Sequence, residues 1–289
     1  MTMRICLLGG SGQVGTEILR LAGPDLALTS LGREAADLSD PAACAAIVAG
    51  TDADVVINVA AYTAVDQAES EEDLAAVINA EAPAAMARAA ADRGLPFLHV
   101  STDYVYDGSG TAPFTPDSPT GPLNAYGRTK LAGDLGVIAA GGPHAILRTS
   151  WVFSAHGSNF VGTMLRLGRE REKLTIVADQ VGGPTAAADI ARALVTIARA
   201  FHEGRGQSGV YHFSGARDVS WADFAREIFT QAGIGCAVED IPTSAYPTPA
   251  IRPSNSRLDC ASTEAVFGIK RPDWRRSLAD VLKELGEIT

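Results

Sequence analysis

The sequence predicts an α/β fold, a doubly wound parallel sheet followed by a smaller C-terminal lobe. Three observations support this prediction. In the first half, short aliphatic or β-branched runs alternate with alanine-rich helical segments, and a glycine-rich turn joins the first run to the first helix. After residue 150, glycine, proline and short polar segments become frequent. Strands that alternate with helices form βαβ units, in which both faces of a parallel sheet are covered.

The first domain, residues 1–150, carries strands expected at 5–8, 26–31, 54–59, 97–100 and 145–148, which are short runs of mostly apolar residues. Helices are expected at 13–21 and 71–93. Gly94 ends the second helix and Pro96 follows it, because glycine accepts the left-handed conformation at a helix end and proline cannot continue a helix.

The second half, residues 151–289, is expected to form mainly the smaller lobe, which we assign to substrate binding. Glycine and proline cluster at 181–185 and 246–249. A helix expected at 187–201 and a strand at 210–213 are candidates to rejoin the first sheet, so we assign 186–214 to the first domain. No internal repeat or low-complexity linker separates the halves, and we expect both to share one cleft.

Composition and charge argue against several classes of protein. The 289 residues are 46% hydrophobic and 20% charged, with a formal net charge of -10. Nucleic acid is not an expected partner, because binding its phosphate backbone needs concentrated Lys and Arg. No apolar run approaches the roughly 18–20 residues that span a membrane, and residues 4–8 lead into the glycine turn, which does not resemble a signal peptide. We expect a cytoplasmic protein whose scattered cysteines are reduced, namely Cys6, Cys44, Cys236 and Cys260.

The turn at residues 9–15 predicts a dinucleotide site. It fits the pattern GxxGxxG, with Gly9, Gly12 and Gly15 at the three glycine positions. Glycine is needed where the turn is tight, where the backbone approaches a pyrophosphate and where helix meets strand. Gln13 and Val14 open the helix, whose unpaired N–H groups favour phosphate. The bare pattern also fits an ordinary turn, but its place between the first strand and helix favours an NAD(P)-binding Rossmann domain.

The end of the second expected strand bears on the choice of cofactor. An acidic residue there would bind the ribose 2′-hydroxyl of NAD. Residues 28–33 contain small polar residues and end in Arg33, which favours the 2′-phosphate of NADP. Glu34 follows directly, so NADH stays an alternative to NADPH.

Tyr126 and Lys130 lie four residues apart on an expected helix, which puts both side chains on one face. Reduction of a ketone creates an alkoxide that must be protonated. A free tyrosine titrates near ~10, so a neighbouring positive charge helps it exchange a proton near neutrality. The pair therefore predicts a proton donor assisted by a lysine, although the same spacing also occurs on exposed helix faces.

Ser101, Thr102 and Asp103 directly follow an expected buried strand. Ligands of open α/β sheets bind just beyond the carboxyl ends of the strands. A hydroxyl there can donate to a substrate carbonyl and stabilise the developing oxyanion. The simpler interpretation is that Ser101 and Thr102 cap a turn, and the combination with the glycine turn and Tyr126 favours catalysis.

These residues, together with longer motifs, resemble the extended short-chain dehydrogenase/reductases, and within them the dTDP-4-dehydrorhamnose reductase family. The resemblance covers nearly the whole chain and rests on residues 12–15, 58–66, 101–105, 148–153, 159–161, 179–185 and 252–258. It implies that NADPH reduces the C4 keto group of dTDP-4-dehydro-L-rhamnose to give dTDP-L-rhamnose, the last step in making this precursor of cell-surface polysaccharide.

The resemblance also implies roles for individual residues. Tyr126 would protonate the alkoxide, Lys130 would lower the pKa of Tyr126 and bind the nicotinamide ribose, and Thr102 would hold the carbonyl. Asp37 and Leu38 would lie near the adenine. The remaining implied contacts are Ala61, Tyr62 and Thr63 beside the cofactor, and Asp103, Trp151, Asn159 and Arg252 on the sugar nucleotide, where an aromatic face such as that of Trp151 suits a pyranose or a base. Simple core packing is the other interpretation of Trp151.

The chain departs from the family pattern at three points. Tyr62 stands where the family usually has histidine, and the acidic second-strand residue of some members is missing. Some members are described as magnesium-dependent dimers. Glu17 has a matching position, but the full acidic set is not found, so no metal ligand is predicted. A homodimer and bound Mg²⁺ are both compatible with the resemblance.

Two other functions compete with the reductase. A 4-epimerase or 4,6-dehydratase of the same superfamily is disfavoured, because a dehydratase usually has an acid pair after the threonine, and Asp103 is followed by Tyr104. The regulatory subunit of methionine adenosyltransferase resembles this family without catalysing the reaction. Intact Thr102, Tyr126 and Lys130 argue against such a binding role.

Overall fold

A six-stranded parallel sheet forms the centre of the larger domain. The computed structural model describes residues 2–289. The strands follow the order β10-β5-β4-β3-β1-β2, and every pair is parallel. Their bounds are Met3–Leu8 for β1, Leu26–Leu31 for β2, Val55–Asn58 for β3, Phe97–Thr102 for β4, His144–Thr149 for β5 and Gly209–His212 for β10. The direction of the strand order reverses between β1 and β3, so the expected doubly wound α/β class is confirmed.

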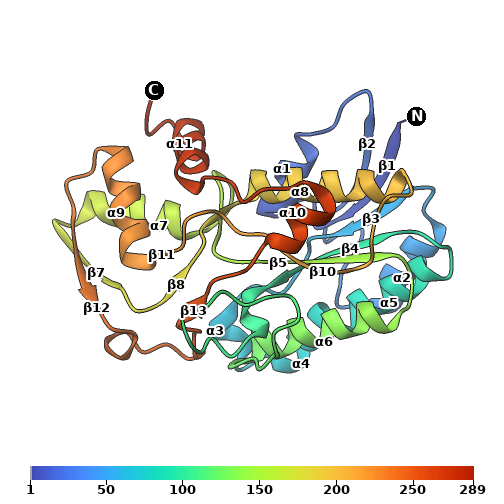
Figure 1. Cartoon of the computed structure of the whole chain (residues 1–289), viewed down its shortest axis with the longest axis horizontal. Coiled ribbons are helices and arrows are strands. Elements are labelled where there is room, and N and C mark those ends of the chain that lie inside the picture. The colour runs from blue at the N-terminus through green and yellow to red at the C-terminus, as the bar shows by residue number, and fades with distance from the viewer. Residues whose placement is uncertain (1) are drawn as a thin grey trace.

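Helices cover both faces of this sheet (Figure 1). On one face lie α1 (Gln13–Leu19), α8 (Ala187–His202) and α10 (Ala261–Phe267), and on the other lie α2 (Pro41–Gly50), α5 (Ala82–Ala91) and α6 (Ala125–Ala139). Successive residues of β1 serve the two cores, because side chains of a strand alternate between its faces. Leu7 packs in the cluster of Ile18 and Ile190, whereas Leu8 packs with Val48 and Met86. Burial of both faces explains the continuous apolar run.

The helix expected at 71–93 is interrupted. The structure has α4 (Glu72–Ala76), a π-helical turn at Val77–Glu81 and then α5. Pro83 stands in the first turn of α5 and has no N–H to donate to the preceding turn, which favours the wider π-helical geometry. The end of the segment is as expected, with Gly94 in the left-handed region at φ +65°.

The smaller lobe is built from the second half of the chain and forms the left part of Figure 1. Its helices are α7 (Phe160–Glu170), α9 (Trp221–Ala232) and α11 (Trp274–Glu284), whose core includes Phe153, Phe224 and Leu278. Short strands complete it: β7 (Lys173–Val177) with β12 (Ala237–Ile241), β6 (Val152–Phe153) with β9 (Thr185–Ala186), and β8 (Val181–Gly182) between β11 (Val219–Ser220) and β13 (Asn255–Ser256).

Segments from the second half also build the larger domain. Strand β10 extends the six-stranded sheet beside β5, and α8 packs on α1 and β3. Helix α10 packs against α8 and β10, so a segment beyond residue 214 also lies on this domain. The polypeptide therefore crosses between the two parts several times.

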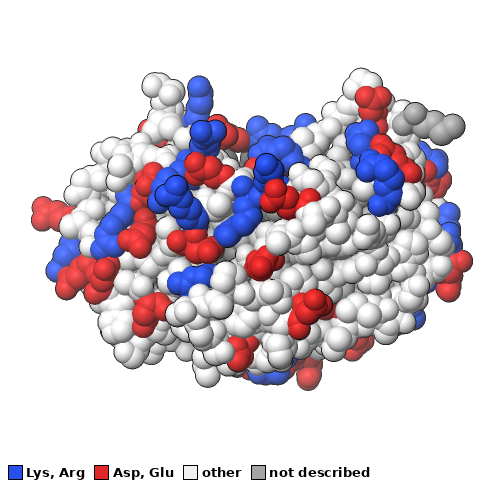
Figure 2. Space-filling model, viewed as in Figure 1, with Lys and Arg blue, Asp and Glu red and all other residues white. Residues whose placement is uncertain are grey.

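Several surface and composition features bear on function. All four cysteines are buried and free. Within residues 2–289, no helix is both long and apolar enough to cross a membrane. On the face drawn in Figure 2, most Lys and Arg side chains lie beside Asp and Glu.

Candidate active site at the carboxyl ends of the strands

The glycine turn follows β1 at the point where the strand order reverses. Gly9 has φ +90°, and a Cβ there would lie 2.6 Å from the backbone nitrogen of Ala60. A Cβ on Gly15 would overlap the carbonyl oxygen of Gly9. Both positions therefore require glycine.

The same turn leaves room for a ligand at Gly12. A Cβ there would meet only the carbonyl oxygen of Gly9, at 3.5 Å, and Gly12 caps α1 without a side-chain hydrogen bond. The first N–H groups of α1, which begins with Gln13 and Val14, have no partners within the helix. This cradle fits the pyrophosphate of a dinucleotide.

The residues expected near the adenosine lie beyond β2. The side chain of Arg33 is 80% exposed, and its Nε lies 3.8 Å from Asp37 Oδ2. Asp37 accepts a hydrogen bond from the backbone N–H of Ser39, which is the main cause of its lowered pKa. Leu38 is buried beside it. Arg33 is therefore accessible to a phosphate at this edge.

Ala61, Tyr62 and Thr63 follow β3, on the other side of the reversal point. The phenol of Tyr62 donates a hydrogen bond of 2.7 Å to Glu71, and its backbone N–H donates to Asn79. Ala61 is half-buried and Thr63 is exposed. Tyr62, which stands where the resemblance led us to expect histidine, thus has its hydroxyl engaged by Glu71.

Tyr126 lies in the first turn of α6 and is half-buried. The side chain of Asn124 caps this helix by accepting a hydrogen bond of 2.8 Å from the N–H of Gly127. A Cβ on Gly127 would overlap the carbonyl oxygen of Tyr104, so glycine here lets α6 approach the end of β4. The rings of Tyr104 and Tyr126 meet edge to face, with centroids 5.5 Å apart.

Burial raises the pKa of Tyr126 well above its ordinary value, and the hydroxyl of Thr102 beside the phenol opposes the shift. The phenol therefore keeps its proton at neutral pH. Thr102 also caps a short 3₁₀ turn, since its Oγ1 accepts from the N–H of Tyr104 at 3.2 Å and donates to Asp103 Oδ1 at 3.1 Å. Thr102 therefore caps the turn, as its simpler interpretation expects, and its hydroxyl also lies beside Tyr126.

Asp103 is buried next to Thr102. Burial raises its pKa to about 6, and hydrogen bonds with Ser256 and Thr102 oppose that shift. Its Oδ2 has no hydrogen-bond partner among residues 2–289. Asp103 thus has one buried carboxylate oxygen that no hydrogen bond satisfies.

Lys130 lies one turn after Tyr126 on α6 and is 1% exposed. Its Nζ donates a hydrogen bond of 2.7 Å to the carbonyl oxygen of Val100 and lies 3.1 Å from Nε2 of His99. Burial lowers the pKa of Lys130 to about 8. The amine of Lys130 thus points toward β4 in the structure.

Trp151 and Arg252 extend the site toward the smaller lobe. Trp151 has φ +49°, and its ring stacks on Trp221 with centroids 3.6 Å apart. Arg252 forms a two-pronged ion pair with Asp66, through contacts of 3.0 and 2.8 Å, and its charge lowers the pKa of Tyr104 against a larger effect of burial. Trp151 thus has a packing role, and Arg252 lies near the tyrosines.

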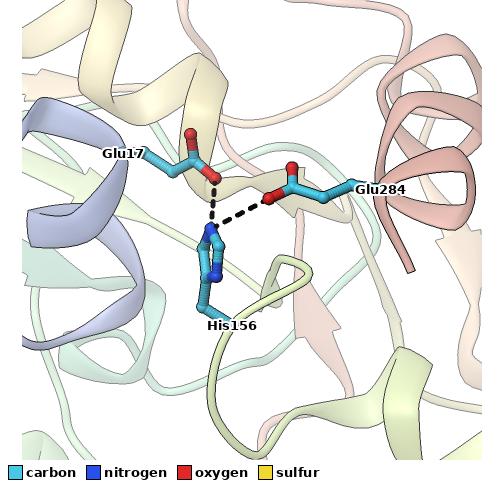
Figure 3. Close-up of side chains that lie close together, drawn as sticks. All are labelled: Glu17, His156 and Glu284. Atoms are coloured by element: carbon cyan, nitrogen blue, oxygen red, sulfur yellow. Dashed lines mark ion pairs between the residues drawn. The ribbon is translucent and has the colours of Figure 1, made fainter. Parts of the chain in front are cut away.

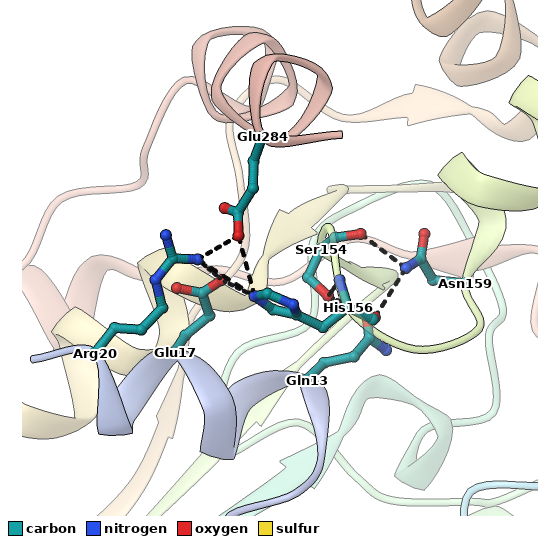
Figure 4. A network of polar contacts seen from close by, with 7 residues as sticks. All are labelled: Gln13, Glu17, Arg20, Ser154, His156, Asn159 and Glu284. Carbon is teal, nitrogen blue, oxygen red and sulfur yellow. Dashed lines mark hydrogen bonds and ion pairs between the residues drawn. The ribbon is translucent and has the colours of Figure 1, made fainter. Parts of the chain in front are cut away.

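Asn159 is used as a helix cap. Its Oδ1 accepts from the N–H groups of Val161 and Gly162, and its Nδ2 donates to the carbonyl oxygen of Ser154 at 2.9 Å. The hydroxyl of Ser154 in turn donates to Gln13 Oε1 at 2.8 Å, so this loop contacts the glycine turn (Figure 4). Asn159 therefore holds the loop whose Ser154 contacts Gln13 at the start of α1.

Glu17 belongs to a cluster that only the fold assembles. It meets His156 and Glu284 of α11, and the three side chains offer ligand atoms within 4.8 Å of one another (Figure 3). Nε2 of His156 lies 3.2 Å from Glu17 Oε1 and 3.5 Å from Glu284 Oε1. Such a set could hold a metal ion.

Arg20 supplies the positive charge of this cluster. Its Nη1 lies 2.6 Å from Glu284, 3.4 Å from Glu17 and 3.3 Å from Nε2 of His156 (Figure 4). Mg²⁺ prefers an octahedral set of oxygen ligands, several of them water. The guanidinium of Arg20 contacts all three candidate ligand atoms, and one of these atoms is the nitrogen of His156. The residues therefore do not fit Mg²⁺. They form an ionic contact between α1 and α11.

His99 and Asn58 are polar members of the site that the sequence analysis did not identify. Both are fully buried, and Nδ2 of Asn58 lies 3.1 Å from Nδ1 of His99. Each is a polar residue in an otherwise apolar strand, and this pattern could have identified them, because buried polar groups are uncommon unless they are paired.

Comparisons of the sequence with known proteins point to one family. The RmlD substrate binding domain family model matches residues 3–287. A dTDP-4-dehydrorhamnose reductase of Burkholderia thailandensis is 45% identical over 98% of this chain and 99% of its own length. That of Sinorhizobium fredii is 43% identical over 95% of each chain.

Two solved structures of dTDP-4-dehydrorhamnose reductases share the fold of this chain. A dTDP-4-dehydrorhamnose reductase of Clostridium acetobutylicum superposes with a TM-score of 0.92 at 36% identity, over 98% of this chain and 100% of the other. One of Bacillus anthracis, in complex with NADP, has a TM-score of 0.92 at 32% identity with the same coverage. The chain belongs to the dTDP-4-dehydrorhamnose reductase family.

Proposed function

We propose that this protein uses NADPH to reduce the C4 keto group of dTDP-4-dehydro-L-rhamnose, giving dTDP-L-rhamnose in the last step of its synthesis. The observation that carries the proposal is that the hydroxyl of Thr102, at the carboxyl end of β4, lies beside the phenol of Tyr126, at the same edge of the parallel sheet as the glycine turn after β1. The relatives' shared name supplies the substrate.

The chemistry assigned to the chain is positioning and proton transfer. When bound, NADPH supplies the hydride that adds to C4. The hydroxyl of Thr102 donates to the substrate carbonyl and stabilises negative charge on its oxygen. Tyr126 transfers its phenolic proton to that oxygen, and the phenolate then regains a proton from solvent. The raised pKa of Tyr126 suits this direction, because the donor must start protonated.

The preference for NADPH over NADH rests on the edge beyond β2. Arg33 is exposed there, and the strand ends without an acidic residue to bind a ribose hydroxyl. A guanidinium matches a phosphate in charge and geometry. We assign Arg33 to the 2′-phosphate.

The sugar nucleotide is assigned to the side of the cleft facing the smaller lobe. Asp103 offers a buried oxygen, Arg252 a positive charge and Trp151 an aromatic surface. We further propose that the protein works in the cytoplasm, where nicotinamide cofactor and nucleotide sugar are both available.

The test follows the transferred hydrogen. The purified chain is incubated with dTDP-4-dehydro-L-rhamnose and NADPH carrying deuterium at the transferred position, and the product is analysed by NMR. We expect dTDP-L-rhamnose with deuterium at C4. Deuterium at another carbon, or an epimerised sugar with cofactor retained on the protein, would refute the proposal. A folded chain that transfers no deuterium but binds methionine adenosyltransferase would support the regulatory role instead.

A further inference from the structure

Arg252 lies on the segment that joins β12 to β13, and the larger domain holds this segment at two backbone groups. Asp66, which follows β3, accepts a hydrogen bond of 3.1 Å from the backbone N–H of Ala250. Asn124, the N-cap of α6, donates through Nδ2 to the carbonyl oxygen of Ile251 at 2.8 Å. The backbone just before Arg252 is therefore fixed beside the helix that carries the proton donor.

Asp66 also binds the side chain of Arg252. Its Oδ1 lies 3.0 Å from Nη1 of the guanidinium, and its Oδ2 lies 2.8 Å from Nη2. Nη1 donates a second hydrogen bond, of 3.2 Å, to the carbonyl oxygen of Ala250. The hydrogen bond with Arg252 lowers the pKa of Asp66, so the carboxylate stays ionised at neutral pH. One carboxylate thus holds both the backbone of this segment and the guanidinium.

These contacts leave one edge of the guanidinium free. Arginine has five N–H donors in a planar fork, and the three hydrogen bonds above use both donors of Nη1 and one of Nη2. The N–H on Nε and the second N–H on Nη2 have no partner among residues 2–289. These two N–H groups are parallel, and they lie on a different edge from the one that Asp66 occupies. The Arg252 side chain is 25% exposed, so a ligand can reach it from solvent.

A second two-pronged ion pair of the larger domain has the opposite arrangement. Arg128, on α6, donates to Glu72 through Nε at 2.8 Å and through Nη2 at 2.7 Å. The edge that contains Nε is therefore already occupied in Arg128. In Arg252 the same edge is free, and its two parallel donors match two oxygens of one phosphate group.

Arg252 lies one side chain away from the proton donor. Its charge acts on Tyr104, and the ring of Tyr104 meets that of Tyr126 edge to face. In a 4-keto sugar nucleotide the diphosphate is attached at C1, across the pyranose ring from C4. A group that binds the diphosphate should therefore lie near the tyrosine that protonates the C4 oxygen, but not at it.

We propose that Asp66 is a positioning residue that presents the free edge of Arg252 to the diphosphate of the sugar nucleotide. This role rests on the proposed function, because it concerns the substrate side of the same site. A guanidinium that is already ordered loses less conformational entropy when a ligand binds. Since the carboxylate offsets the positive charge of the guanidinium, the pair contributes through its orientation and not through net charge.

Calorimetry with dTDP measures this contribution without turnover. Asp66→Asn keeps the size of the side chain but removes its charge and one of its two acceptor oxygens. We expect the Kd for dTDP to rise about 3–10-fold, the cost of ordering one long side chain on binding. The Kd for NADPH should stay unchanged, because the glycine turn does not involve Asp66. Glu72→Gln is the matched control, since it breaks the other two-pronged pair and should change neither constant.

A double-mutant cycle tests whether Asp66 acts through Arg252. Arg252→Met removes the guanidinium and should raise the Kd for dTDP about tenfold or more. In that background Asp66→Asn should cause no further rise, because no guanidinium is left to orient. A second rise of the same size would overturn the proposal. Tighter binding of dTDP by the single variant Asp66→Asn would also overturn it, because the carboxylate would then compete with the diphosphate for Arg252.

Steady-state kinetics separates positioning from a general distortion of the site. Asp66→Asn should raise KM for the sugar nucleotide and retain kcat, because the group binds substrate and transition state alike. An equal rise in the Kd for NADPH would show a general distortion and contradict the proposal.

The proposed function can fail separately from this role of Asp66. A parent chain that shows the dTDP effects but reduces no sugar would refute the function and support the positioning role. A parent chain that reduces the sugar, with unchanged dTDP affinity in Asp66→Asn, would refute the positioning role alone. A parent chain that does not bind dTDP would overturn both.

Discussion

Replacing Tyr126 by phenylalanine removes one hydroxyl and leaves the packing of the ring in place. The edge-to-face contact with Tyr104, with centroids 5.5 Å apart, involves ring atoms that phenylalanine keeps. The hydrogen bond that caps α6, from the backbone N–H of Gly127 to the side chain of Asn124, does not involve the Tyr126 hydroxyl and is also retained. The variant should therefore fold like the parent and lose only the proton donor.

The expected loss follows from the role of that proton. The phenol is the group placed beside Thr102 whose raised pKa keeps a transferable proton at neutral pH. A positioned general acid contributes about 10²–10⁴-fold, which corresponds to roughly 3–5 kcal/mol of transition-state stabilisation. Since the hydroxyl acts on the forming alkoxide, kcat should fall by this factor while KM for the sugar nucleotide changes little.

Steady-state NADPH oxidation measures the effect, with Tyr104→Phe as a matched control. Tyr104→Phe removes the same hydroxyl from the neighbouring ring. This variant should retain kcat within about fivefold, because losing a group that does not act in the transition state costs at most ~1 kcal/mol. A Tyr126→Phe protein with kcat within tenfold of the parent would refute the assignment of Tyr126. Equal losses in the two variants would show that packing, and not proton donation, is being measured.

Further predictions concern the cofactor turn, the buried charges and the ionic cluster. Gly15→Ala should raise the Kd for NADPH about tenfold or more (~1.4 kcal/mol) by calorimetry, because its Cβ would overlap the turn; unchanged affinity would contradict the steric argument. Asp134→Leu should lower the free energy of unfolding in urea by about 3–5 kcal/mol, because it leaves Arg148 buried and unpaired, and adding Arg148→Met should restore most of the loss; an uncorrected loss would point to packing instead. Dialysis against EDTA should leave turnover unchanged, because the guanidinium of Arg20 already contacts both Glu17 and Glu284; a loss restored by Mg²⁺ would show that the cluster binds metal. The folded-state pKa of Lys130, about 8, is below that of the unfolded chain, ~10.4, so the unfolded chain binds the extra proton and stability relative to Lys130→Met should rise with pH across that window; a flat difference in urea midpoints would argue against the buried amine.

The sequence predicted the strands from their short, mostly apolar runs, both at the centre and at the edge of the sheet. Residues 26–31 were expected as a strand and form β2 with the same bounds, and residues 97–100 form the start of β4. The π-helical turn at Val77–Glu81 was missed, because hydrophobic periodicity does not show that Pro83 lacks the N–H needed to continue the helix. The missing N–H of Pro83 therefore accounts for the difference between the expected continuous helix and the observed interruption.

The candidate site was predictable where its residues are close in sequence. The glycine turn and the Tyr126–Lys130 spacing are local patterns, and each occupies one element of the structure. The hydrogen-bond partners of Lys130 both lie in β4, and no spacing rule connects one of them, His99, to Asn58 of β3. The ionic cluster likewise joins Glu17 to Glu284 across the length of the chain, so only the fold could assemble it.

The central claim is a reduction at C4, and the most direct test is the stoichiometry of NADPH consumption by the purified chain. Cofactor absorbance is followed while measured amounts of dTDP-4-dehydro-L-rhamnose are added. The account predicts rapid oxidation of one NADPH for each sugar nucleotide, with dTDP-L-rhamnose as the product. Folded protein that oxidises neither NADPH nor NADH in the presence of this substrate would contradict it.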